Sequence, residues 1–391
     1  MEGVILNITF LIGNGFDRNL GLKTTYSDFV KHYKKTDPKT ATLKKFHTYI
    51  KENDELWSSA EIAMGKYTGE LEKGQAEVFV ECQTDFCENL AEYLKDEVRR
   101  IDFADSDEKV LNAFSRLNNL VQVFPTQERS GLNDIFQKKK NENIIFNFIC
   151  FNYTLTLDEC LNIVQGNMGV LGVHKNGSQV LEHRIGEICH VHGTVDKEMV
   201  FGVNDDSQIQ NLDVFDCEDG DLYKNLLIKV QTNASYLENT DTKATRLLQN
   251  SNLIYVFGMS FGDTDKLWWD RICTWLNGYH ERHLIIQKYD LPTKTVFPAR
   301  YQLAERKAKK EITKHSNLDN NKKLEIEKRI HVTNENIFSP ISRIAKPTFQ
   351  EQYLLALEQN ENEELYQKYI STLEQIKNEE ILDSSKETVQ V

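Results

Sequence analysis

A glycine-containing turn near the start of the chain has the residue types needed to bind a phosphate. An apolar stretch runs directly into the sequence Gly13-Asn14-Gly15-Phe16-Asp17. Glycine permits a tight turn and lets the backbone approach a phosphate closely. The third glycine of the G-x-G-x-x-G dinucleotide fingerprint is missing, so on pattern alone a plain strand-to-helix turn fits as well. Asp17 could orient a ribose hydroxyl or a water, or simply begin a helix.

Two further side chains could act together with this turn. His192 follows an apolar run and precedes Gly193, and its imidazole can exchange a proton near neutral pH, which suits a general base. Asn152 also follows an apolar run, and its amide could fix a sugar hydroxyl or cap the next helix. Asp263, at the start of a predicted helix, is ambiguous in the same way as Asp17.

The histidines also permit metal chemistry. His190 and His192 alternate along a predicted strand and would share a face, and His174 and His183 lie upstream. Zinc requires a third or fourth ligand with its own hydrogen-bonded support, and no spacing in the sequence identifies one. We therefore expect no metal.

The candidate residues must be positioned by the elements around them. Short apolar runs alternate with helical stretches, which predicts an α/β fold with a mostly parallel sheet and helices on both faces. The carboxyl ends of parallel strands meet at one edge of a sheet, so Gly13, Asn152 and His192 should converge there. The expected strands are Ile5–Ile12, Ile144–Phe151, Glu187–Val191, Met199–Val203, Leu253–Phe257, His283–Gln287 and Ile330–Val332.

Long helical segments are expected outside the sheet. About 130 residues separate the first two strands, far more than the roughly dozen that a crossover needs, so we expect an inserted helical lobe. Apolar spacing predicts a helix over Ala76–Arg99, whereas Thr126–Asn143 has the composition of a linker. Further helices are expected over Ala304–Arg329 and Tyr353–Ile376, followed by a disordered tail, Asp383–Val391.

Composition limits the class of protein. The net charge of -13 argues against a broad surface for duplex DNA, although a local basic groove leaves nucleic acid open as a ligand. The first ten residues lack the features of a signal peptide, and no apolar stretch approaches the ~18 residues of a membrane span. We expect a cytoplasmic protein. The seven cysteines form no C-x-x-C pair, so free thiols are expected.

The residues around the glycine turn form a longer and more specific pattern. They resemble the opening signature of the bacteriophage abortive-infection AbiH family, and further motifs follow in the order that this family shows. The resemblance covers residues 5 to about 290. The matching residues are Ile12 to Asp17, Gly21-Leu22-Lys23-Thr24, Tyr26, Asp28-Phe29, Trp57 with Glu61, Phe151-Asn152-Tyr153-Thr154, His190-Val191-His192-Gly193, Phe201-Gly202-Val203-Asn204 and Gly258 to Asp263.

The AbiH family is in turn similar to the sirtuin superfamily, which implies a sirtuin-like, Rossmann-type core that binds NAD. By motif, the glycine turn would hold the pyrophosphate, Asn152 would lie beside the nicotinamide ribose, and His192 would act as the base. The other expected ligand-binding residues are Phe16, Asp17, Gly258, Ser260 and Asp263. Sirtuin deacylases carry a zinc ribbon, which the missing C-x-x-C pairs exclude here. Thr154 stands where an acidic residue is common in sirtuin-like proteins.

The resemblance also implies an organisation of the chain. Residues 1–30 and 144–335 would form the sirtuin-like core, residues 31–143 the inserted helical lobe, and residues 336–391 a C-terminal helix and disordered tail. The expected function is a cytoplasmic phage-defence effector, NAD glycohydrolase-like, that binds and hydrolyses NAD or a related nucleotide. A nucleotide ligand, a phage-derived trigger and a homo-oligomer are the expected partners.

Two alternatives stay open. The first is a nuclease or phosphodiester hydrolase that uses His190 and His192. The second is a non-catalytic sensor that binds a nucleotide without turning it over. A shared fold does not by itself require a shared reaction.

Overall fold

The structure is a computed structural model that describes residues 5–124, 126–236, 240–262, 265–292 and 298–348. It divides into the units Met1–Ile344 and Ala345–Val391. The described part of the second unit, residues 345–348, contains no helix or strand. The architecture that follows belongs to the first unit.

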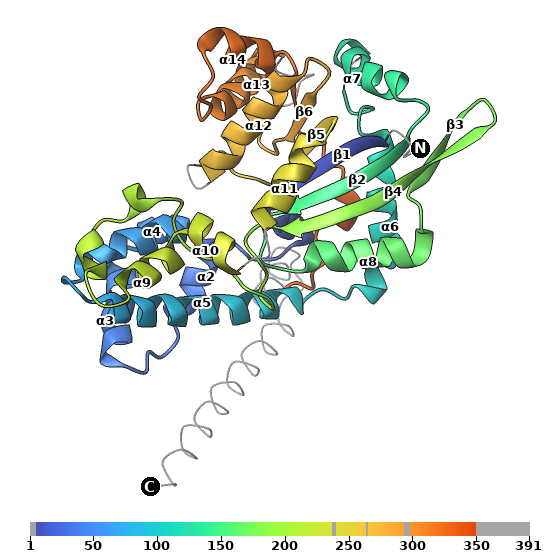
Figure 1. Ribbon diagram of the computed structural model, residues 1–391. Helices are drawn as coiled ribbons and strands as arrows, with labels where there is room; N and C mark the ends of the chain where they lie inside the picture. Colours follow the sequence, from blue (N-terminus) through green and yellow to red (C-terminus); the bar gives the residue numbers. More distant parts are fainter. Residues whose placement is uncertain (1–4, 125, 237–239, 263–264, 293–297, 349–391) are drawn as a thin grey trace. The chain divides into compact units, whose positions relative to one another are not determined.

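Seven strands form one sheet among the described residues (Figure 1). They are β1 (Ile5–Ile12), β2 (Asn143–Cys150), β3 (Gly172–Asn176), β4 (Gln179–His190), β5 (Leu253–Phe257), β6 (His283–Gln287) and β7 (Ile330–Thr333). Their order is β3-β4-β2-β1-β5-β6-β7, and only the pair of β3 and β4 is antiparallel. The predicted α/β fold with a mostly parallel sheet is confirmed.

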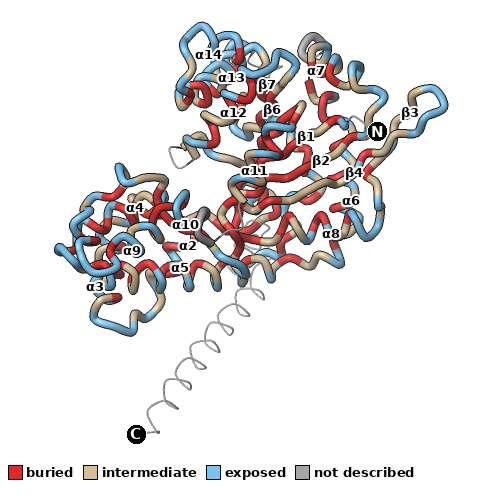
Figure 2. The backbone as a smooth tube through the Cα atoms, in the orientation of Figure 1, coloured by how far each residue is buried: buried red, intermediate tan, exposed pale blue. Residues whose placement is uncertain are grey.

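Successive residues of the central strands face opposite sides of the sheet, as a strand period of two requires. On one side, Phe10 of β1 packs against Phe148 and Tyr255, with ring centroids 5.3 and 5.2 Å apart. Helix α6 (Asp107–Ser115) adds Phe114 on this side. On the other side, Leu11 shares a core with helices α11 (Thr240–Gln249) and α12 (Lys266–Gly278). The central strands are consequently buried (Figure 2).

The remaining helices connect the strands. They are α1 (Gly15–Leu20), α2 (Tyr26–Tyr33), α3 (Ala41–Glu52), α4 (Ala60–Tyr67), α5 (Ala76–Val98), α7 (Thr126–Lys138), α8 (Thr156–Met168), α9 (Gly220–Leu227), α10 (Lys229–Tyr236), α13 (Pro298–Thr313) and α14 (Asn320–Glu327). Helix α5 confirms the helix predicted over Ala76–Arg99, because its apolar residues recur at helical spacing and are buried.

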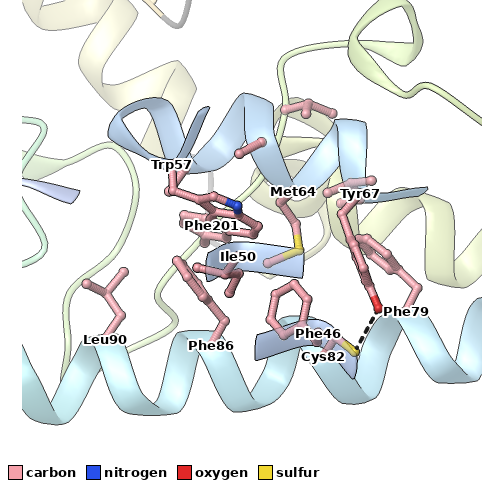
Figure 3. Close-up of a cluster of buried hydrophobic side chains, with 14 of the residues drawn as sticks. Phe46, Ile50, Trp57, Met64, Tyr67, Phe79, Cys82, Phe86, Leu90 and Phe201 are labelled. Atoms are coloured by element: carbon pink, nitrogen blue, oxygen red, sulfur yellow. Dashed lines mark hydrogen bonds between the residues drawn. The ribbon is translucent and has the colours of Figure 1, made fainter. Parts of the chain in front are cut away.

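A second hydrophobic core lies among helices α2 to α5 (Figure 3). Its centre is aromatic: the rings of Trp57 and Phe86 lie 5.1 Å apart, and Phe46 packs against both. Phe201 and Phe215, which follow β4 in the chain, belong to the same core. Segments from before β2 and after β4 therefore stabilise each other here, and the division of the chain into a core and an inserted lobe stays a prediction.

Two predictions about local structure are wrong. Residues 199–203 form no strand. This segment is irregular because Phe201 packs into the second core, and the backbone at Gly202 lies so close to Leu227 that a Cβ would come within 1.9 Å of its carbonyl oxygen. The expected linker Thr126–Asn143 instead contains helix α7, because Leu132 and Ile135 are buried one turn apart despite the polar composition around them.

The ends of other predicted elements also shift. The expected helix Ala304–Arg329 is split into α13 and α14, since Asp319 accepts a hydrogen bond from the Lys322 amide and begins a new helix. Strand β4 starts well before the predicted Glu187 and pairs with β3, which was not predicted because its residues are only partly buried. The segments Tyr353–Ile376 and Asp383–Val391 lie outside the described residues.

Candidate functional site

The loops after five parallel strands line one cavity of about 1020 Å³. Gly13 follows β1, Asn152 follows β2, His192 follows β4, Gly258 follows β5 and Lys288 follows β6. Strands β2 and β4 lie on one side of β1, and β5 and β6 lie on the other. The cavity is therefore at the carboxyl edge, where the strand order reverses and open α/β sheets bind ligands.

The two glycines of the β1 loop allow a close approach to the β5 loop. A Cβ at Gly15 would lie 2.3 Å from the Cα of Gly258, and a Cβ at Gly13 would lie 2.7 Å from the Gly258 oxygen. The Gly13 amide donates to the Phe257 carbonyl at 2.9 Å, and the Gly15 amide donates to the Gly258 carbonyl at 2.8 Å. Because these amides are already bonded within the protein, other groups have to supply most of any phosphate contact.

The side chains of the same loop hold the site together. Asn14 donates to the Thr24 carbonyl at 3.0 Å and accepts from the Thr24 hydroxyl at 2.5 Å. Phe16 is fully buried and packs edge-on against Phe257 and Phe338, so its side chain belongs to the core. Of the residues from Gly13 to Asp17, all but Phe16 line the cavity.

Asp17 links the β1 loop to the β2 loop. It is only 1% exposed, and it accepts hydrogen bonds from Thr154 at 2.7 Å and Thr156 at 2.5 Å. Burial raises the pKa of Asp17 to about 6, although the two hydroxyl groups lower it. Of the two interpretations of Asp17, these contacts favour a structural one. Thr154, in the position where an acidic residue was expected, serves as the partner of Asp17.

Asn152 lines the cavity, and its side-chain amide has no hydrogen-bond partner among the described residues. The residue is 6% exposed, and both amide atoms are buried. It lies near Asp17 and helps to lower the pKa of that carboxyl, but makes no hydrogen bond of normal geometry with it. An unpaired buried polar group costs about 1–3 kcal/mol, so an amide in this state is suited to a ligand that enters the cavity.

His190 fixes the loop that carries Asn152. Its Nδ1 lies 3.2 Å from the Asn152 carbonyl oxygen, and its Nε2 lies 2.9 Å from an oxygen of Asp158. Both partners are acceptors, so the ring must carry two protons to satisfy them. Burial lowers the pKa of His190, but Cys150 and Asp158 raise it by more, to about 11. His190 is therefore a cation that positions Asn152.

His192 lies in the cavity wall beside the rings of Phe151 and Tyr153. Burial and the charge of Lys229 hold its pKa well below the usual range, so the imidazole is uncharged at neutral pH. His192 thus has different surroundings from His190. No group of three His, Cys, Asp or Glu side chains in the described part of the chain is arranged to hold a metal ion.

The structure contains an ion pair at the cavity that the sequence did not predict. Lys229 donates to Glu61 at 2.8 Å, and both side chains are buried. The Tyr26 and Tyr153 hydroxyls lie 3.2 and 3.4 Å from the other Glu61 oxygen. Glu61 and Lys229 are 168 residues apart, so no local pattern could have paired them; only the family motif drew attention to Glu61.

Arg18, Ser260 and Asp265 also line the cavity. Arg18 is exposed and makes no ion pair with any described residue. Ser260 and Asp265 line the cavity from the segment after β5, and their side-chain oxygens lie 3.5 Å apart. Asp263, which was expected to bind ligand, lies outside the described residues. Nothing in the sequence pointed to Arg18 or Asp265 as residues of the site.

Most of the residues that line the cavity fall within a match to a known protein family. The model of a family described as bacteriophage abortive infection AbiH matches residues 9–287. The chain belongs to the AbiH family. The match includes every candidate residue from the β1 loop to Asp265, whereas Lys288 to Asp290 and Asn336 line the cavity of this AbiH protein from outside it. No curated protein matches the chain. Among its described helices, none has the length and apolar character needed to cross a membrane.

Proposed function

We propose that this AbiH protein binds NAD or a related dinucleotide in the cavity and acts in phage defence by hydrolysing the bond between nicotinamide and ribose. The observation that carries the proposal is the strand order around the cavity. Without the antiparallel β3, the strands lie in the order third, second, first, fourth, fifth, sixth along the chain, which is the order of dinucleotide-binding Rossmann sheets. The volume of about 1020 Å³ suits a ligand of that size.

The phosphates would lie beside Arg18. Arg18 lines the cavity and has no carboxylate partner among the described residues, and a guanidinium can bind phosphate oxygens through two parallel hydrogen bonds. The Gly13 and Gly15 amides donate to carbonyls of the β5 loop. In this proposal the glycines shape the cavity, and Arg18 supplies the charge.

The ribose would lie between Asn152 and His192. The unpartnered Asn152 amide could donate to or accept from a ribose hydroxyl, which would remove the cost of its burial. His192 is uncharged and could accept a hydrogen bond from a ribose hydroxyl or from water. In the hydrolysis, a water oxygen bonds to the ribose C1′ while the C1′–N bond breaks with its electron pair going to the pyridinium nitrogen. Nicotinamide leaves neutral, and the proton of the water passes to a base.

The organisation of the chain belongs to the same proposal. Residues 1–30 and 144–335 would be the sirtuin-like core, and residues 31–143 the helical lobe that contributes Glu61 to the cavity wall. A phage-derived trigger and a homo-oligomer fit a growth-arresting enzyme that must stay inactive before infection. The phosphodiester hydrolase is less well supported, because His190 is bonded to Asp158 and Asn152 and is not available for catalysis.

The experiment is to incubate the purified chain with NAD and follow free nicotinamide. His192→Ala and Asn152→Ala should each lower turnover by about 10²-fold or more while thermal unfolding stays near that of the wild type. His32→Ala is the matched control, because His32 is exposed and does not line the cavity. Variants that are unstable but remain fully active would contradict the assignment. Binding without any turnover would identify a nucleotide sensor.

A further inference from the structure

An aspartate at the start of α12 lines the cavity instead of capping its helix. Asp265 occupies the N-cap position, where an aspartate normally accepts a hydrogen bond from an amide of the first turn. Its side chain makes no such bond. It receives instead a long hydrogen bond, of 3.5 Å, from Ser260 of the β5 loop. The chain therefore forgoes this helix cap, and Asp265 lines the cavity instead.

The charges that face Asp265 come from two other helices. Burial raises the pKa of Asp265 to about 6, Lys229 of α10 lowers it, Glu61 of α4 raises it, and the Ser260 hydroxyl lowers it. The adjacent Lys266 is paired with Asp205 at 3.0 Å. Asp265 is thus ionised at neutral pH but holds a proton more firmly than an ordinary aspartate does.

Neither of the neighbouring ionisable groups is as well suited to accept a proton. The Glu61 carboxylate is engaged on both oxygens, by Lys229 on one and by Tyr26 and Tyr153 on the other. The pKa of His192 is held well below its usual range, and a base is most effective when its pKa lies near the working pH. Asp265 combines a place in the cavity wall with a carboxylate that has few partners.

We propose that Asp265 is the general base that accepts the proton from the attacking water. This inference rests on the proposed function. The water oxygen bonds to the ribose C1′, the electron pair of the C1′–N bond goes to the pyridinium nitrogen, and the water proton goes to an Asp265 oxygen and then to solvent. Asn152, whose unpartnered amide lines the same cavity, fixes the ribose, and the uncharged His192 orients the water.

The test compares nicotinamide release by the full chain and by Asp265→Asn from about pH 5 to about pH 8, with NAD affinity measured by calorimetry. The wild-type rate should fall below about pH 6, where Asp265 becomes protonated. Asp265→Asn should bind NAD within a few-fold of the wild type, turn over about 10²-fold more slowly, and lose this acidic limb. Asp270→Asn is the matched control, since Asp270 also lies on α12 but bonds to the Asn317 amide and does not line the cavity.

A second variant keeps the test decisive if Asp265→Asn does not fold. Ser260→Ala removes a hydrogen bond that lowers the pKa of Asp265, so the acidic limb should move to higher pH. An unshifted limb overturns the inference, as does an Asp265→Asn protein that is folded, active and unchanged in its pH profile. In both cases the proposed function survives. A wild-type protein that neither binds nor cleaves NAD removes the proposed function, and this inference with it.

Discussion

Replacement of Gly15 by alanine should destabilise the fold through one contact between two loops. The added Cβ would lie 2.3 Å from the Gly258 Cα and 3.0 Å from its carbonyl oxygen. Both neighbours are backbone atoms, and real Cβ contacts are not shorter than 3.0 Å, so the loops must separate by about 0.7 Å (3.0 minus 2.3). Overpacking of this kind costs about 1–3 kcal/mol. The hydrogen bond from the Gly15 amide to the Gly258 carbonyl, which is 2.8 Å long, would also weaken, at a further cost to stability of about 1 kcal/mol.

The free energy of unfolding should therefore fall by about 2–4 kcal/mol, measured as the urea midpoint followed by tryptophan fluorescence. Gly166→Ala is the matched control, because Gly166 lies inside α8 and a Cβ there meets nothing within 4 Å. That change should leave stability equal or raise it by up to about 1 kcal/mol. A Gly15→Ala protein as stable as the wild type would show that the two loops do not pack as closely as described. If that stable protein had also lost NAD binding, Gly15 would touch the phosphate directly.

Charged groups at and beside the cavity should affect NAD affinity and stability in different ways. Arg18→Glu should weaken NAD binding by at least about tenfold in calorimetry without changing stability. Arg99→Glu, which removes an exposed ion pair with Asp96 at the end of α5, should leave the affinity unchanged; equal affinities of the two variants would show that Arg18 does not contact phosphate. Asp17 has a folded pKa raised from 3.8 to about 6, so the folded chain holds this proton more tightly than the unfolded chain. The contribution of Asp17 to stability should therefore fall as the pH rises from about 4 to about 6, against the opposite contribution of buried histidines such as His183 and His331, whose pKa values burial lowers. Asp17→Asn should remove the Asp17 contribution, so the urea midpoint of the wild type minus that of the variant should fall over this range; a constant difference would contradict the pKa assignment. His190→Ala leaves Asp158 and the Asn152 carbonyl without their donor and should lower stability by about 1–3 kcal/mol and speed amide exchange in residues 151–155. A thermal unfolding curve and exchange rates equal to those of the wild type would mean that His190 does not fix this loop.

Short apolar runs were a reliable guide to the buried centre of the sheet. Strands β1, β5 and β6 have the predicted ends, and β2 is displaced by one residue, because strands buried on both faces read as continuous apolar segments. Helix α7 and the irregular segment after β4 were predicted wrongly, since their structure depends on packing partners that a local composition does not reveal.

The candidate site was predictable only in part, and for a topological reason. Gly13, Asn152 and His192 each follow a parallel strand, so their convergence follows from the fold class. The contact of Gly15 with Gly258, and the pairing of Glu61 with Lys229, join residues far apart in the chain and have no sequence signature. Asp265 had no signal in the sequence, because it occupies an ordinary helix-cap position and only its side-chain contacts separate it from a cap.

The proposed binding of a dinucleotide at the carboxyl edge of the sheet is tested most directly by hydrogen–deuterium exchange with and without NAD. NAD should slow exchange in the loops after β1, β2, β4, β5 and β6, which together line the cavity, and leave the β3–β4 hairpin unchanged. Exchange that is unaltered at saturating NAD, or slowed only in segments away from these five loops, would contradict the account.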